Sequence, residues 1–171
     1  MTYLAITVVG HDRPGIIAQA ADALADSGMN LEDSSMTLLR GHFAMTLICA
    51  GGASVADVER ALAPLADGSL TVDVRELSAG GEPRSSGGGT HLVTVHGADR
   101  LGIVARLASV VAAAGGNITD LTTRLAGDLY VLLAEVDLDP AASERLEAEL
   151  AAVAAELGVG VTLRAVERDE L

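Results

Sequence analysis

The 171-residue sequence contains no lysine and no tryptophan, only one phenylalanine and two tyrosines, and a single cysteine. Without lysine there is no phosphate-binding loop of the G-x-x-x-x-G-K-[ST] type. One cysteine excludes an internal disulfide and a C-x-x-C motif. Cys49 stands in the apolar run MTLICA, so we expect it to be a small buried residue. The four histidines form no H-E-x-x-H motif. We therefore expect no metal, no cofactor and no catalytic residue, and a protein that is not an enzyme.

Basic residues are also scarce. The chain has 11 arginines and 24 acidic residues, which gives a formal net charge of −13. Non-specific binding to nucleic acid depends on cations that displace phosphate counterions, so we expect neither direct nucleic-acid binding nor attraction to an anionic membrane. No apolar run reaches the roughly 18 residues of a spanning helix. The start MTYLAITVVG lacks the basic region of a signal peptide. These features predict a cytoplasmic protein.

The sequence repeats itself at an offset of 87 residues. From Thr7 to Leu38, 14 of 32 positions are identical without a gap, and Gly10–Ile16 aligns with Gly97–Ile103. Between the copies the chain is rich in glycine and serine, a composition typical of a flexible linker. We expect one unit at residues 1–77, a linker at 78–90 and a second unit at 91–171.

Each copy shows the element order β-α-β-β-α-β. In the first we expect strands at 3–9, 31–39, 42–50 and 70–76, with helices from Pro14 to Gly28 and at 55–65. In the second we expect strands at 91–97, 117–126, 129–137 and 159–166, with helices at 101–114 and 140–157. This order is typical of the ferredoxin-like α+β fold, an antiparallel four-stranded sheet with both helices on one face. We expect the two units to dock side by side.

The turn before the first helix of each unit carries the residues of chemical interest. A helix N-terminus offers unpaired N–H groups to an anion such as a carboxylate. We expect Pro14 at the first helical position, and Gly15 and Gly102 in the first helical turn, where a ligand can approach closely. Asp12 and Asp99 either cap the helix or hold an ammonium group, and both alternatives stay open.

Three further residues extend this candidate site. Asn30 and Asn117 begin the following strand and can both donate and accept hydrogen bonds, and the alternative is that each is only a turn residue. His11 lies in the first turn and either contacts a bound carboxylate or is an ordinary loop histidine. Together the set matches an amino acid zwitterion.

The motif D-R-P-G-I-I at 12–17, with G-M-N-L at 28–31, resembles the ACT domain, a small-molecule-sensing module. The second copy has D-R-L-G-I-V at 99–104 and G-G-N-I at 115–118, so Leu101 replaces the proline. A tandem pair is similar to regulators of the glycine-cleavage repressor type. The resemblance implies a ferredoxin-like fold and amino acid binding where the turn of one unit meets the second strand of another. It implies the ligand-contacting positions Asp12, Pro14, Gly15, Ile16 and Asn30, and Asp99, Leu101, Gly102, Ile103 and Asn117.

We therefore expect a regulatory protein that senses a small amino acid at the interface of its two units and modulates a partner protein, in transcriptional or metabolic control. A homodimer is compatible with this arrangement. If one site alone is functional, we expect it in the first copy, which keeps both Pro14 and His11. The alternative is a ligand-free protein-interaction module that uses the open sheet edges.

Overall fold

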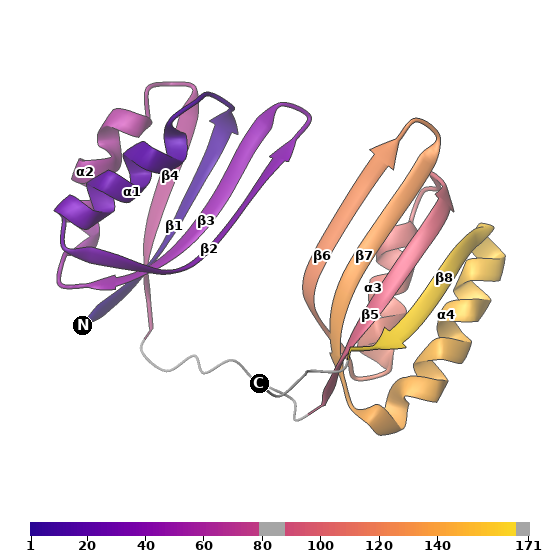
Figure 1. Ribbon diagram of the computed structural model, residues 1–171. Coiled ribbons are helices and arrows are strands. Elements are labelled where there is room, and N and C mark those ends of the chain that lie inside the picture. Colours follow the sequence, from indigo (N-terminus) through magenta and orange to yellow (C-terminus); the bar gives the residue numbers. More distant parts are fainter. Residues whose placement is uncertain (79–87, 167–171) are drawn as a thin grey trace. The chain divides into compact units, whose positions relative to one another are not determined.

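The computed structural model describes residues 1–78 and 88–166, which form two compact units (Figure 1). The first unit contains β1 (Thr2–His11), α1 (Ile16–Asp26), β2 (Met29–Leu39), β3 (His42–Gly51), α2 (Val55–Leu62), the short 3-10 helix η1 (Ala63–Leu65) and β4 (Leu70–Leu77). The second contains β5 (Gly89–Ala98), α3 (Ile103–Ala113), β6 (Asn117–Ala126), β7 (Leu129–Leu138), the 3-10 helix η2 (Pro140–Ala142), α4 (Ser143–Leu157) and β8 (Val159–Ala165).

Each unit has one antiparallel four-stranded sheet. The strand orders are β2-β3-β1-β4 and β6-β7-β5-β8, so the first strand of each unit is central. Both helices of a unit cover the same face of its sheet, and no described helix of that unit lies on the other face (Figure 1). The predicted ferredoxin-like fold is confirmed in both units.

The hydrophobic core of each unit follows from the periods of its elements. In the middle of β1 the alternate residues Leu4, Ile6 and Val8 are completely buried and face the helices. In α1 the buried residues are spaced by four: Ile16, Ala20 and Leu24. The second unit repeats this arrangement with a separate core built around β5, β7, α3 and α4. Side chains buried to this degree each contribute about 1.5–3 kcal/mol to stability.

The predicted element boundaries differ from the structure at helix ends. The helix predicted over 55–65 ends at Leu62 and continues as η1, since Pro64 lacks the N–H that an α-helix would use. The helix predicted over 140–157 begins as the 3-10 helix η2 and becomes α-helical at Ser143.

The predicted linker, residues 78–90, extends too far at its C-terminal end. Gly89 and Thr90 already belong to β5, where they pair with Leu138 and Asp137. Residues 79–87, most of the predicted linker, lie outside the described residues, so its flexibility stays a prediction.

The second strand of each unit carries a β-bulge near its start. The pairing of β2 with β3 shifts between Leu31 and Asp33, and the pairing of β6 with β7 shifts between Ile118 and Asp120. Both strands are also edge strands of their sheets. The duplication has therefore kept the same irregularity at the same place in both units.

Among the side chains that the structure describes, two polar or reactive ones are buried. Cys49 is fully buried, as expected, and burial raises the pKa of its thiol. His91 is 3% exposed on the helix side of β5, with Nδ1 3.0 Å from the Gly89 carbonyl oxygen and Nε2 3.2 Å from the Ser143 hydroxyl. Among the described residues, no helix has both the length and the apolar character needed to span a membrane.

Replacing Ser54 by alanine should destabilise the first unit by about 1 kcal/mol. The Ser54 hydroxyl accepts a hydrogen bond from the Asp57 N–H at 3.2 Å, and the Asp57 carboxylate accepts one from the Ser54 N–H, so the two residues form a capping box at the start of α2. Thermal unfolding at neutral pH measures the loss.

The capping box also predicts a pH dependence. Hydrogen bonds from Ser54, and then from Arg60, hold the pKa of Asp57 below its ordinary value. A carboxyl group with a depressed pKa stabilises the fold above its unfolded-state pKa and loses this effect as the pH falls through the folded-state pKa. Asp57→Asn should therefore lower the melting temperature at pH 7 and have little effect near pH 2. An equal effect at both pH values would contradict this prediction.

Candidate functional site

The turns before α1 and α3 have the same backbone geometry. Gly15 and Gly102 are the residues that precede each helix, with φ of 90° and 91°, in the left-handed region. The first helical hydrogen bonds run from the Gln19 N–H to the Gly15 carbonyl and from the Arg106 N–H to the Gly102 carbonyl, both at 2.9 Å. No side chain caps either helix. The N–H groups of the first helical turn therefore remain available to a ligand.

Two expectations about this turn were wrong in detail, and one of the two alternatives left open for the aspartates is excluded. Pro14 does not open the helix, because α1 begins two residues later at Ile16. Asp12 caps nothing, and neither does Asp99. Gly15 and its counterpart precede the first helical turn, and a Cβ at either position would meet nothing within 4 Å. Glycine is needed there because φ is positive, and close packing within the unit is not the reason.

The isoleucine that follows the glycine in each motif contributes only backbone to such a site. Ile16 and Ile103 are 2% and 3% exposed, and both side chains belong to the core of their unit. Their N–H groups lie in the first helical turn, where an α-helix has no internal acceptor for them. The proposed contact of these two residues with a ligand is therefore restricted to the backbone.

A surface hollow of about 530 Å³ lies at the turn of the second unit. Residues 99–105 and Tyr130 line it, so the predicted positions Asp99, Leu101, Gly102 and Ile103 come together around one space. Leu101, which replaces the proline of the first copy, is fully exposed. The hollow combines an acidic side chain, a basic side chain and apolar surface.

The arginines of the two turns have different surroundings. Arg13 Nη2 donates to Gln19 Oε1 at 3.1 Å, and Arg13 Nε lies 3.7 Å from Asp67 Oδ2. Hydrogen bonds from Ser69, with a smaller contribution from Arg13, hold the pKa of Asp67 below its ordinary value. Arg13 thus links the turn before α1 to the segment before β4.

In the second unit the corresponding ion pair joins α3 to α4 and does not involve the arginine of the turn. The position of Gln19 is occupied by Arg106, which forms an ion pair with Glu156. Glu156 stands three residues before Val159 in β8, as Asp67 stands three residues before Leu70 in β4. Within residues 1–78 and 88–166, Arg100 forms neither an ion pair nor a side-chain hydrogen bond, and it lines the hollow. Its guanidinium group is therefore available to a ligand.

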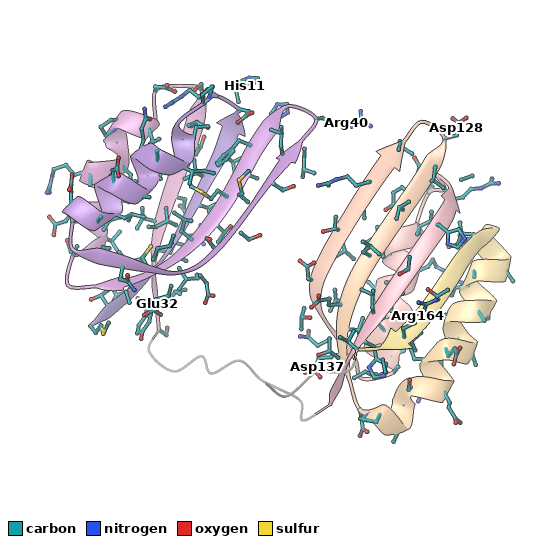
Figure 2. The ribbon with its side chains drawn as sticks, viewed as in Figure 1. His11, Glu32, Arg40, Asp128, Asp137 and Arg164 are labelled. Carbon is teal, nitrogen blue, oxygen red and sulfur yellow. The ribbon has the colours of Figure 1, made fainter. Side chains whose placement is uncertain are left out.

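The asparagines lie at the other end of each sheet. Asn30 pairs with Ala50, which pairs with Tyr3, whereas the turn follows Gly10 at the opposite end of β1. Seven residues of extended strand separate Tyr3 from Gly10, so Asn30 lies about 24 Å from the turn along the sheet. In Figure 2, His11 and Arg40 are labelled at one end of the sheet of the first unit, and Glu32 is labelled at its other end. Asn117, which pairs with Asp137, is placed in the same way in the second unit. Neither unit by itself brings its asparagine to its turn.

His11 is part of β1 and not of the turn. It is exposed, and its ring centre lies 5.2 Å from that of His42 on β3. Four residues of the hollow were missed from the sequence: Arg100, Val104, Ala105 and Tyr130. The sequence offered two signals. The dipeptide D-R recurs in both turns, and Tyr130 aligns with Phe43, whose phenyl ring is 2% exposed, so a phenol replaces a buried phenyl ring.

Comparisons with known proteins agree with this architecture. The model of the ACT domain family matches residues 2–75 and 90–164. The glycine cleavage system transcriptional repressor of Escherichia coli is 27% identical over 122 residues, 71% of this chain and 64% of that protein. A UPF0237 protein of Methanopyrus kandleri is 48% identical over 48 residues, 28% of this chain and 53% of that protein. The matches therefore span about half to just under two thirds of these curated relatives.

A solved structure resembles the chain over nearly its full length. The crystal structure of an unknown protein from Galdieria sulphuraria superposes with a TM-score of 0.81 at 27% identity, covering 97% of this chain and 99% of that one. Because the family model matches both units, the chain belongs to the ACT domain family and carries one ACT domain in each unit.

Proposed function

We propose that this chain is a regulatory protein that binds a small amino acid at the turn before α3 and transmits its presence to a partner protein. The observation that carries the proposal is the free Arg100 guanidinium group beside Asp99, in a hollow that ends at an uncapped helix N-terminus. The amino-acid-sensing role that the ACT family suggests, and the repressor function of the Escherichia coli relative, support it.

The chemistry of the hollow fits a zwitterion. A guanidinium group and helix N–H groups both bind carboxylates, and the Asp99 carboxylate is a partner for an ammonium group. Leu101 and Val104 offer apolar contact to the carbon atoms of the ligand, and the Tyr130 hydroxyl adds a polar group. The turn of the first unit has the same backbone, but Arg13 is held by Gln19 and Asp67. The contacts thus favour the second turn, although the sequence favoured the first.

The asparagines join such a site only through a second ACT domain. Asn30 lies about 24 Å from the turn of its own unit along the sheet. A site that uses both groups therefore combines the turn of one unit with the second strand of another, in the same chain or in a second copy. Ligand binding then stabilises one association of domains, and its effect is limited by its differential affinity for the two states.

Titration of the protein with each of the twenty amino acids tests this function. Calorimetry should detect one small amino acid, which should also raise the melting temperature, because a ligand at 100 times its Kd stabilises the folded state by about 2.7 kcal/mol. Asp99→Asn should weaken binding more than Asp12→Asn, its counterpart in the first unit. The absence of heat and of a melting shift with all twenty would contradict amino acid sensing.

The exposed edges favour a second candidate, a protein-interaction module without a ligand. The edge strands β2 and β6 each pair on one side only, and Met36, Leu38 and Leu125 on them are 45–48% exposed. Exposed apolar edges are typical of surfaces that pair with another chain. Partner binding that is unaffected by Asp99→Asn, in a protein that binds no amino acid, would support this alternative.

A further inference from the structure

Two histidines of the first unit meet across neighbouring strands. His11 ends β1 and His42 begins β3, and the two residues are directly opposite in the strand register. Their ring centres lie 5.2 Å apart with an angle of 33° between the planes. Both side chains are exposed, at the end of the sheet where His11 is labelled in Figure 2. The pair is open to solvent and to a solute.

The backbone explains why the two rings are so close. The Asp12 N–H donates to the Gly41 carbonyl at 3.3 Å, and the His11 N–H donates in the opposite direction, to the Ser69 carbonyl at 3.0 Å. His11 and His42 are therefore a non-hydrogen-bonded pair between β1 and β3. In antiparallel sheets such pairs have the shorter Cα separation and the closest side chains, which lie on the same face. The strand register thus holds both imidazoles together without help from a loop.

The separation of the rings fits a shared metal ion. An imidazole nitrogen binds Zn²⁺ at 2.0–2.1 Å, so two rings bound to one tetrahedral ion have centres about 5 Å apart. The observed 5.2 Å agrees with this value. We propose that His11 and His42 form a two-histidine site for a borderline divalent transition metal such as Zn²⁺, which favours imidazole ligands. No sequence motif marks this pair, because its members lie far apart along the chain and meet only through strand pairing.

The site supplies two ligands and leaves the remaining coordination positions to water or to a bound molecule. Within the described residues no group of three or more His, Cys, Asp and Glu side chains is placed to hold a metal. The duplication provides an internal control, because the equivalent cross-strand pair in the second unit is Ala98 and Leu129. Of the other histidines, His91 is buried with both ring nitrogens near acceptor or donor groups, and His96 is exposed.

Calorimetric titration of the untagged full chain with ZnCl₂ tests the proposal. We expect one Zn²⁺ per chain, loss of binding in His11→Ala and in His42→Ala, and unchanged binding in the control His96→Ala. All three side chains are exposed, and circular dichroism verifies that each variant keeps its fold. The double variant Ala98→His/Leu129→His places the same register pair in the second unit, and it should add a second equivalent of Zn²⁺.

Zinc binding that survives the loss of either His11 or His42 would overturn the proposal, as would a wild-type protein that binds no Zn²⁺. A double variant that gains no second equivalent would overturn the argument that the cross-strand register is sufficient. Amino acid binding is measured separately in metal-free buffer, so the failure of this proposal and the failure of the amino acid site are distinguishable.

Discussion

Replacing Gly10 by alanine should destabilise the first unit by about 2–3 kcal/mol. Gly10 lies in β1 between Phe43 on β3 and Leu70 on β4. A Cβ atom there would lie 2.0 Å from the Ser69 carbonyl oxygen and 2.8 Å from the Leu70 Cα, and both contacts are with backbone. Since backbone cannot move aside as a flexible side chain does, β1 and β4 would have to separate beside the turn.

Thermal unfolding followed by circular dichroism measures the loss, and hydrogen exchange of the β1 and β3 amides assigns it to the first unit. Gly52→Ala is the matched control, because a Cβ at that position meets nothing within 4 Å and Gly52 has no positive φ. The corresponding change Gly97→Ala should have a smaller effect, since its nearest contact, at 2.9 Å, is a side-chain methyl of Val159. Equal melting temperatures for Gly10→Ala and Gly52→Ala would refute the steric argument.

Replacing Arg100 by alanine should weaken amino acid binding by about 10- to 100-fold, because a hydrogen bond to a charged group contributes about 1.5–3 kcal/mol. Arg100 lines the hollow and has no partner among the described residues, so its removal should leave the stability of the second unit nearly unchanged. Calorimetry with the amino acid identified in the titration measures the change in Kd, and the melting temperature without ligand measures stability.

The two units supply the controls for this prediction. Arg13→Ala should leave ligand affinity unchanged and should lower the stability of the first unit, because Arg13 contacts Gln19 and Asp67. Arg106→Gln should weaken ligand binding although Arg100 is still present, because it frees Glu156 to attract Arg100 as Asp67 attracts Arg13. If Arg13→Ala weakened binding more than Arg100→Ala, the functional turn would be the first one.

Much of the fold could be predicted because it depends on local patterns. The offset of 87 residues revealed the doubling, and alternation in β1 and the four-residue spacing in α1 identified the buried faces. Helix ends were predicted less well, since they depend on backbone conformation. Gly15 was singled out from the sequence as a site residue, but its left-handed conformation, and hence the start of α1 at Ile16, became visible only in the structure.

The candidate site was less predictable because it depends on contacts between distant segments. Asn30 and Asp12 are close in sequence, yet β1 and β2 place them at opposite ends of the sheet. The difference between Arg13 and Arg100 accompanies a glutamine-to-arginine change between the equivalent positions 19 and 106, within helices that looked equivalent. The pair of His11 and His42 requires the strand register, which the sequence alone left undetermined.

The bulges at the start of β2 and β6 have a consequence for assembly. An incoming strand can form an uninterrupted ladder only beyond the bulge, along Asp33–Leu39 or Asp120–Ala126. A shift by one residue would turn every side chain of an added strand to the wrong face. The bulge would therefore limit the position at which such a strand can begin to pair. A strand added to either edge would therefore meet the same limits of length and register, because the two edges descend from one ancestral strand.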